Sequence, residues 1–167
     1  MHKRFQLLLA ALTCLVMPGV GASPAKLVDG PAPDFALRST AGRNLRLSEF
    51  RSEVVVLNFW SKWCGKCGPA MSSLERLHRE YADADVNVIG VAVEGKPEKA
   101  AAAVAEYGLT YPMLLDATQQ VSKQYDLSRL PATLVIDREG TVRSFYQGSD
   151  AGSQPQLAAD VSALLAD

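Results

Sequence analysis

The chain has 167 residues, of which 48% are hydrophobic, and a formal net charge of −1. This length suits one globular domain with a full core, and the composition excludes a low-complexity chain. The near-zero charge, without a cluster of Lys and Arg, argues against a nucleic-acid partner, because phosphate binding relies on such clusters.

Residues 1–22 differ in character from the rest of the chain. A basic stretch at residues 2–4 precedes the apolar residues 5–20, and small residues follow. This layout is typical of a cleaved secretory signal peptide. One alternative is an uncleaved membrane anchor, although the apolar run is slightly short of the roughly 20 residues that a spanning helix needs. Another is a lipoprotein acylated at Cys14, although residues 11–13 make a poor lipid-attachment motif. In each case, we expect the remaining chain in the periplasm or on the extracytoplasmic face of the membrane. Residues 23–33, rich in Pro, Gly and Ala, are predicted to be a linker, and residues 34–167 to form the domain.

Hydrophobic periodicity predicts strands and helices in alternation after the linker. The expected strands cover residues 34–37, 44–47, 54–59, 86–93, 113–115, 133–136 and 141–146. The expected helices are a single turn at 47–50 and longer segments at 67–81, 97–107, 117–125 and 154–165. The first two strands form a hairpin, the middle of the chain implies a parallel core, and the last two strands form a second hairpin that adds antiparallel edge strands. The predicted fold class is therefore α/β, with a central mixed sheet flanked by helices.

Two cysteines three positions apart, Cys64 and Cys67, follow the third predicted strand and open the first long helix. Three uses compete at this spacing: a metal clip, a structural staple and a reversible redox pair. A structural zinc site needs four ligands, and beyond the leader, which contains Cys14, the chain offers two cysteines and His78. A staple is disfavoured because a disulfide that closes so short a loop adds little stability. The redox pair is therefore the favoured interpretation.

The place of the pair in the predicted fold suits redox chemistry. Unpaired amides and the helix dipole at the start of a helix favour negative charge, so a thiol there loses its proton more easily than free cysteine, whose pKa is about 8.5. We expect Cys64 to be the exposed nucleophile that attacks a substrate disulfide. Cys67, facing the body of the protein, then attacks the mixed disulfide and releases the reduced substrate.

The residues around the pair fit this chemistry. Trp63 precedes the nucleophile and is expected to cover it and to contact substrate, while Gly65 and Gly68 leave room for a substrate chain to approach. Lys62 and Lys66 either only solubilise the surface or favour both the thiolate and acidic partners.

Short motifs elsewhere in the chain accompany the cysteine pair. They are Pro31-Ala32-Pro33-Asp34-Phe35, Leu57-Asn58-Phe59-Trp60, Trp63-Cys64-Gly65-Lys66-Cys67, Tyr111-Pro112, Leu130-Pro131-Ala132-Thr133 and Ile136-Asp137. In these motifs the sequence resembles the thioredoxin superfamily, and within it the TlpA/ResA-like disulfide reductases of the bacterial cell envelope. The resemblance implies a thioredoxin-like fold with an N-terminal hairpin and an inserted helix and strand at about residues 94–116. It also implies a cis peptide bond at Pro131, beside the cysteines, with the backbone of Leu130 presented to an extended substrate peptide.

The resemblance leaves the proton acceptor for the second thiol open. Thioredoxin has a buried aspartate where this chain has Asn58, and related reductases often have a glutamate where it has Ala70. Glu94 is a candidate substitute, because it follows the strand 86–93 and parallel strands end at the same edge as the cysteines. The alternative is that Glu94 is an ordinary solvated acid of a loop.

These observations predict an envelope thiol–disulfide oxidoreductase that needs no cofactor and reduces disulfides of client proteins through its CGKC motif. By resemblance, the clients are the haem-binding cysteines of apocytochrome c or the copper-site cysteines of an oxidase assembly factor, and a membrane thiol–disulfide protein supplies the electrons. One alternative is a thiol peroxidase, since Ser61 and Cys64 match part of a peroxide site, although Leu57 occupies the place of its proline. The other is a non-catalytic copper metallochaperone that holds the metal between the two thiolates.

Overall fold

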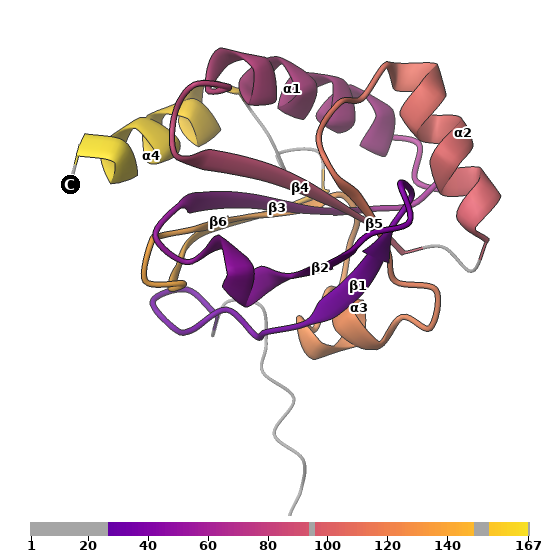
Figure 1. Ribbon diagram of the computed structural model, residues 1–167, viewed down its shortest axis with the longest axis horizontal. Coiled ribbons are helices and arrows are strands. Elements are labelled where there is room, and N and C mark those ends of the chain that lie inside the picture. The colour runs from indigo at the N-terminus through magenta and orange to yellow at the C-terminus, as the bar shows by residue number, and fades with distance from the viewer. Residues whose placement is uncertain (1–26, 94–95, 149–153, 167) are drawn as a thin grey trace, which may run out of the picture.

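A seven-stranded mixed sheet forms the centre of the computed structural model, which describes residues 27–93, 96–148 and 154–166 (Figure 1). The strands are β1 (Ala36–Ser39), β2 (Asn44–Arg46), β3 (Val54–Trp60), β4 (Val86–Ala92), β5 (Met113–Leu115), β6 (Ala132–Ile136) and β7 (Val142–Gln147). Their order across the sheet is β2-β1-β5-β4-β3-β6-β7; β3, β4 and β5 run parallel, and the other pairs are antiparallel. The predicted α/β class and parallel core are confirmed. The predicted leader lies outside the described residues, and none of the described helices is long and apolar enough to cross a membrane.

Helices cover both faces of this sheet (Figure 1). They are the 3₁₀ helix η2 (Leu47–Phe50), α1 (Cys67–Glu80), α2 (Pro97–Tyr107), α3 (Gln120–Gln124) and α4 (Gln154–Ala166). α1, α2 and α4 pack on one face, and α3 and η2 pack on the other. Successive side chains of β3 alternate between the two cores: Val56 and Trp60 face α1, whereas Leu57 and Phe59 face the opposite side. Burial on both faces explains why β3 is a continuous apolar run in the sequence.

Three details of the sheet and helices differ from the prediction. The strand expected at residues 34–37 lies two residues later, at Ala36–Ser39. α3 begins at Gln120 instead of residue 117, because the buried carboxylate of Asp116 accepts hydrogen bonds from the amides of Val121 (3.3 Å) and Ser122 (2.8 Å) and holds the intervening residues in a turn. Periodicity cannot report such a side-chain contact. In addition, of the two strands in the closing hairpin only β7 lies at an edge, since β6 sits between β3 and β7; β2 forms the other edge.

The described part of the predicted linker packs against the domain. Val28 and Pro31 form isolated bridges with Val142 and Thr141, where β7 begins. The side chain of Leu27 is 6% exposed and belongs to the core on the α3 side of the sheet. From Leu27 onward, this segment is therefore part of the folded unit.

Candidate active site

The two cysteines lie between the end of β3 at Trp60 and the start of α1. Cys67 is the first residue of α1 and is 1% exposed, whereas Cys64 is half-buried in the preceding loop. A disulfide joins them, with 5.4 Å between their Cα atoms. As expected from the sequence, the first cysteine is the more accessible one and the second faces the core.

The beginning of α1 carries positive charge that neither its N-cap side chain nor an acidic residue of its first turn compensates. Lys66, the N-cap residue, makes no side-chain hydrogen bond to the first turn, and that turn contains no acidic residue. The free amides and the dipole at this end of a helix favour an anion nearby. A thiolate formed here when the disulfide opens is therefore stabilised by its position.

The peptide bond between Leu130 and Pro131 is cis. β6 begins directly after this bond and pairs with β3, Ala132 lying opposite Phe59. Pro131 thus lies next to the end of β3, from which the cysteine loop departs, and Leu130 packs against the same core as Cys64. Both the isomer and its place beside the cysteines agree with what the resemblance implies.

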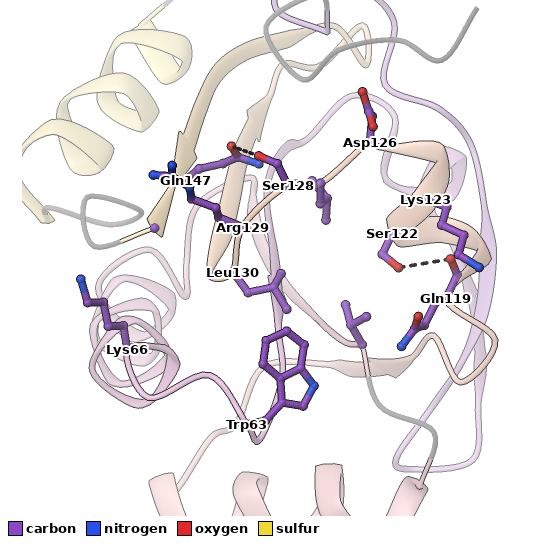
Figure 2. Close-up of a pocket in the computed structure, with 13 residues that line it drawn as sticks. Trp63, Lys66, Gln119, Ser122, Lys123, Asp126, Ser128, Arg129, Leu130 and Gln147 are labelled. Atoms are coloured by element: carbon purple, nitrogen blue, oxygen red, sulfur yellow. Dashed lines mark hydrogen bonds between the residues drawn. The ribbon is translucent and has the colours of Figure 1, made fainter. Parts of the chain in front are cut away.

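A groove of about 720 Å³ lies beside the cysteine loop (Figure 2). Its walls come from that loop, the end of β4, α3, the segment before Pro131 and the end of β7. The lining residues are Trp63, Lys66, Val93, Gln119, Ser122, Lys123, Asp126, Leu127, Ser128, Arg129, Leu130, Gln147 and Gly148. Trp63, 72% exposed, is the one exposed large hydrophobic side chain among the described residues. Trp63 and Leu130, the residues predicted to contact substrate, are thus both part of this lining.

The two lysines of the cysteine loop have different surroundings. Lys62 donates a hydrogen bond to Glu106, near the end of α2, over 2.5 Å. This contact raises the pKa of the lysine and lowers the pKa of the Glu106 carboxyl. Lys66 instead lines the groove. The charge of Lys62 is therefore compensated by a carboxylate, and Lys66 is the lysine of this loop that faces an incoming substrate.

The environment of Gly68 corrects one sequence-based expectation. A Cβ at this buried position in the first turn of α1 would lie 2.5 Å from the hydroxyl oxygen of Tyr107 and 2.8 Å from its Cζ. The space beside Gly68 is therefore filled by the ring of Tyr107, from α2, and is not open to a substrate. Gly65, in contrast, has no atom within 4 Å of its Cβ position. Sequence reasoning missed Tyr107 and Glu106, because no motif links the end of α2 to the cysteine loop.

The residues considered for proton transfer are only partly described. Asn58 is fully buried in β3, and its Nδ2 donates to the hydroxyl of Thr133 (3.0 Å) and the carbonyl of Ala132 (3.3 Å). Its Oδ1 has no hydrogen-bond partner among the described residues. Glu94, the predicted proton acceptor, lies outside the described residues, although Val93 before it lines the groove. The role of Glu94 stays a prediction.

Residues named for the alternative functions are placed as follows. Leu57 is fully buried in the middle of β3. His78 packs edge-on against the ring of Tyr111, with 6.0 Å between the ring centroids. Among residues 27–93, 96–148 and 154–166, no three His, Cys, Asp or Glu side chains are grouped so that they could hold a metal ion.

Comparison with known proteins agrees with this geometry. The AhpC/TSA family matches residues 28–145. The thiol-disulfide oxidoreductase ResA of Geobacillus kaustophilus is 36% identical over 126 residues, which cover 75% of this chain and 72% of that protein. ResA of Bacillus subtilis is 30% identical over 143 residues, with coverage of 85% and 80%. The crystal structure of a secreted Mycobacterium tuberculosis disulfide oxidoreductase homologous to E. coli DsbE superposes with a TM-score of 0.70 at 25% identity, covering 78% of this chain and 96% of that one. The chain therefore belongs to the AhpC/TSA family and is a ResA-like thiol–disulfide oxidoreductase, with Cys64 and Cys67 as its redox pair.

Proposed function

We propose that the protein is an extracytoplasmic reductant of specific protein disulfides, with Cys64 as the nucleophile and Cys67 as the resolving thiol. One observation carries this proposal: Cys64 is half-buried in a loop that walls a groove, while Cys67 is 1% exposed behind it, at the start of α1. An incoming disulfide can reach the first sulfur and not the second.

The reaction proceeds by two thiol–disulfide exchanges. The thiolate of Cys64 attacks one sulfur of the client disulfide, so a mixed disulfide forms and the other client sulfur leaves as a thiolate. The thiolate of Cys67 then attacks the sulfur of Cys64, which closes the disulfide of the protein and releases the client as a dithiol. Two electrons pass to the client, and the protein ends in the oxidised form that the structure holds. Trp63, Leu130 and Pro131 hold the client segment during both steps.

The proposed clients are the haem-binding cysteines of apocytochrome c or the copper-site cysteines of an oxidase assembly factor. A membrane thiol–disulfide protein returns the electrons, and residues 1–22 either direct the chain out of the cytoplasm or tether it to the membrane. The resemblance to disulfide reductases of the bacterial cell envelope supports the clients and the direction. The basic and apolar pattern of the leader supports the location.

A Cys67→Ser variant expressed in the cell envelope tests the assigned roles. Because it cannot resolve the mixed disulfide, it should hold its client through Cys64, and a dithiol should release that client for identification by mass spectrometry. A variant in which both cysteines are serine is the matched control and should capture nothing. Trapping by Cys64→Ser but not by Cys67→Ser would show that the two roles are reversed, and equal trapping by both variants would contradict the assignment of distinct roles.

The redox potential tests the direction. Potentials in this superfamily run from about −270 mV for the reductant thioredoxin to about −120 mV for the oxidant DsbA. Equilibration with a dithiol buffer should place the Cys64–Cys67 couple near the reducing end. A value near the oxidising end would contradict a reductant.

A further inference from the structure

The groove beside the cysteine loop has an uneven charge. Of its described lining residues, Lys66, Lys123 and Arg129 are cationic, and Asp126 is the acid. All four side chains are exposed, and none of the three cations forms an ion pair with a described residue. The described lining of the groove therefore has a net positive charge, on a chain whose overall net charge is −1.

The cations surround an apolar centre. Figure 2 shows Lys66 and Arg129 on one side of the groove and Lys123 on the other, with Trp63 and Leu130 between them. Val93 and Leu127 complete the apolar part of the lining. Of these apolar side chains Trp63 is exposed, Leu127 and Leu130 are half-buried, and Val93 is buried. An apolar centre within a charged rim is the arrangement by which protein surfaces hold a partner segment, the centre giving affinity and the rim giving selectivity.

A further donor lies at the end of β7. The side-chain oxygen of Gln147 accepts a hydrogen bond from Ser128 (3.1 Å), and its Nε2 is buried with no acceptor among the described residues. Within the described lining, this nitrogen is thus an unpaired donor in the wall of the groove, and the solvent-accessible charged donors there are Lys66, Lys123 and Arg129. Carboxylates are acceptors with negative charge, so they suit both the charge and the donors of this wall.

From this arrangement we propose that the groove selects client segments with acidic residues on both sides of the disulfide and an apolar side chain next to it. The apolar side chain packs on Trp63 and Leu130, and the acidic flanks lie against the three cations. The inference rests on the proposed function, because it concerns the client of the same site. It also assigns Lys123 and Arg129 to client selection, which the sequence alone does not do.

Three synthetic peptides of equal length test the preference. Each has the same cyclic disulfide and adjacent leucine, and the flanks are glutamate, glutamine or lysine. The fully reduced protein is mixed with each peptide, and the second-order rate of peptide reduction is measured after acid quench. In low salt, the glutamate peptide should react about tenfold faster than the lysine peptide, because complementary charge accelerates association. In about 0.5 M salt this ratio should fall towards one, since exposed charges are screened.

Two variants locate the preference in the groove. Lys123→Gln/Arg129→Gln should reduce the ratio of the two rates at least threefold, whereas Asp126→Asn should increase it, which a general loss of structure would not do. Lys66 stays intact, because it lies between the cysteines. The matched control, Arg43→Gln/Lys99→Gln, removes two exposed charges that do not line the groove and should leave the ratio unchanged.

The outcomes separate the two proposals. If the protein reduces none of the peptides, the proposed function fails. If it reduces all three at equal rates in low salt, or prefers the lysine peptide, that function stands and the acidic preference is wrong. If the preference persists in Lys123→Gln/Arg129→Gln, it does not arise from this groove.

Discussion

Replacing Gly68 with alanine tests the contact between α1 and Tyr107. The added methyl group would lie 2.5 Å from the hydroxyl oxygen of Tyr107, 2.8 Å from Cζ and 3.0 Å from Cε1, so the ring must retreat by roughly half an ångström or more to reach ordinary van der Waals distance. Overpacking of this kind costs about 1–3 kcal/mol, and we take about 2 kcal/mol because the ring is only partly buried. Alanine in a helical turn regains about 0.5 kcal/mol, less than its advantage in a helix interior. We expect a net loss of about 1.5 kcal/mol.

Urea unfolding of the oxidised protein measures this loss, and two further variants make it specific. In a Tyr107→Ala background the methyl group has space, so Gly68→Ala should stabilise the protein by about 0.5 kcal/mol, a reversal of sign that corresponds to a coupling of about 2 kcal/mol. Gly65→Ala is the matched control, because nothing lies within 4 Å of that Cβ position. Additive effects of the substitutions at positions 68 and 107 would refute the contact, and with it the reason given for glycine in the first turn of α1.

Two other predictions concern charged groups. Burial alone would raise the pKa of Glu75, but hydrogen bonds from the amide and hydroxyl of Thr110 keep this pKa below the usual 4.5. The stabilisation by the Glu75 carboxylate is therefore complete above pH 4.5 and is lost as the pH falls through the folded-state pKa. By urea unfolding, Glu75→Gln should cost about 1.5 kcal/mol at pH 7, and a difference in unfolding free energy between the wild type and this variant that stays constant down to pH 3 would contradict this account. Replacing Glu106 with Gln should remove the carboxylate that pairs with Lys62 and raise the rate at which iodoacetamide alkylates Cys64 at pH 7 by about twofold. The added substitution Lys62→Met should remove the gain, and an unchanged rate in the single variant would show that this pair does not influence the thiol.

The features that could be predicted from the sequence are those encoded locally. The continuous apolar run of β3 indicates a strand buried on both faces, and the helix from Pro97 to Tyr107 follows from its alanines and its proline in the first turn. The cysteine pair is identified by its spacing and by the elements on either side. The cis bond before Pro131 follows from resemblance alone, because sequence statistics favour trans.

The features that could not be predicted depend on contacts between distant positions. Lys62 and Glu106 are 44 residues apart, and no pattern in either segment indicates that they meet. The same holds for the ring of Tyr107 over Gly68, where a glycine that suggests open space in the sequence instead accommodates an aromatic side chain. The start of α3 differs from the predicted residue 117 for a related reason, since the carboxylate of Asp116 outweighs the local preference for helix.

These long-range contacts separate the control of reactivity from the control of selectivity. An ion pair as exposed as Lys62–Glu106 contributes little to stability. The ion pair instead decides where positive charge is presented. It compensates the charge of Lys62 and leaves Lys66 as the lysine of the cysteine loop that faces the groove. Thiolate reactivity then depends chiefly on the uncapped start of α1, while client choice depends on Lys123 and Arg129, which lie in other elements. Substitutions at these two positions can therefore change which client reacts without changing the chemistry of the sulfur that attacks it.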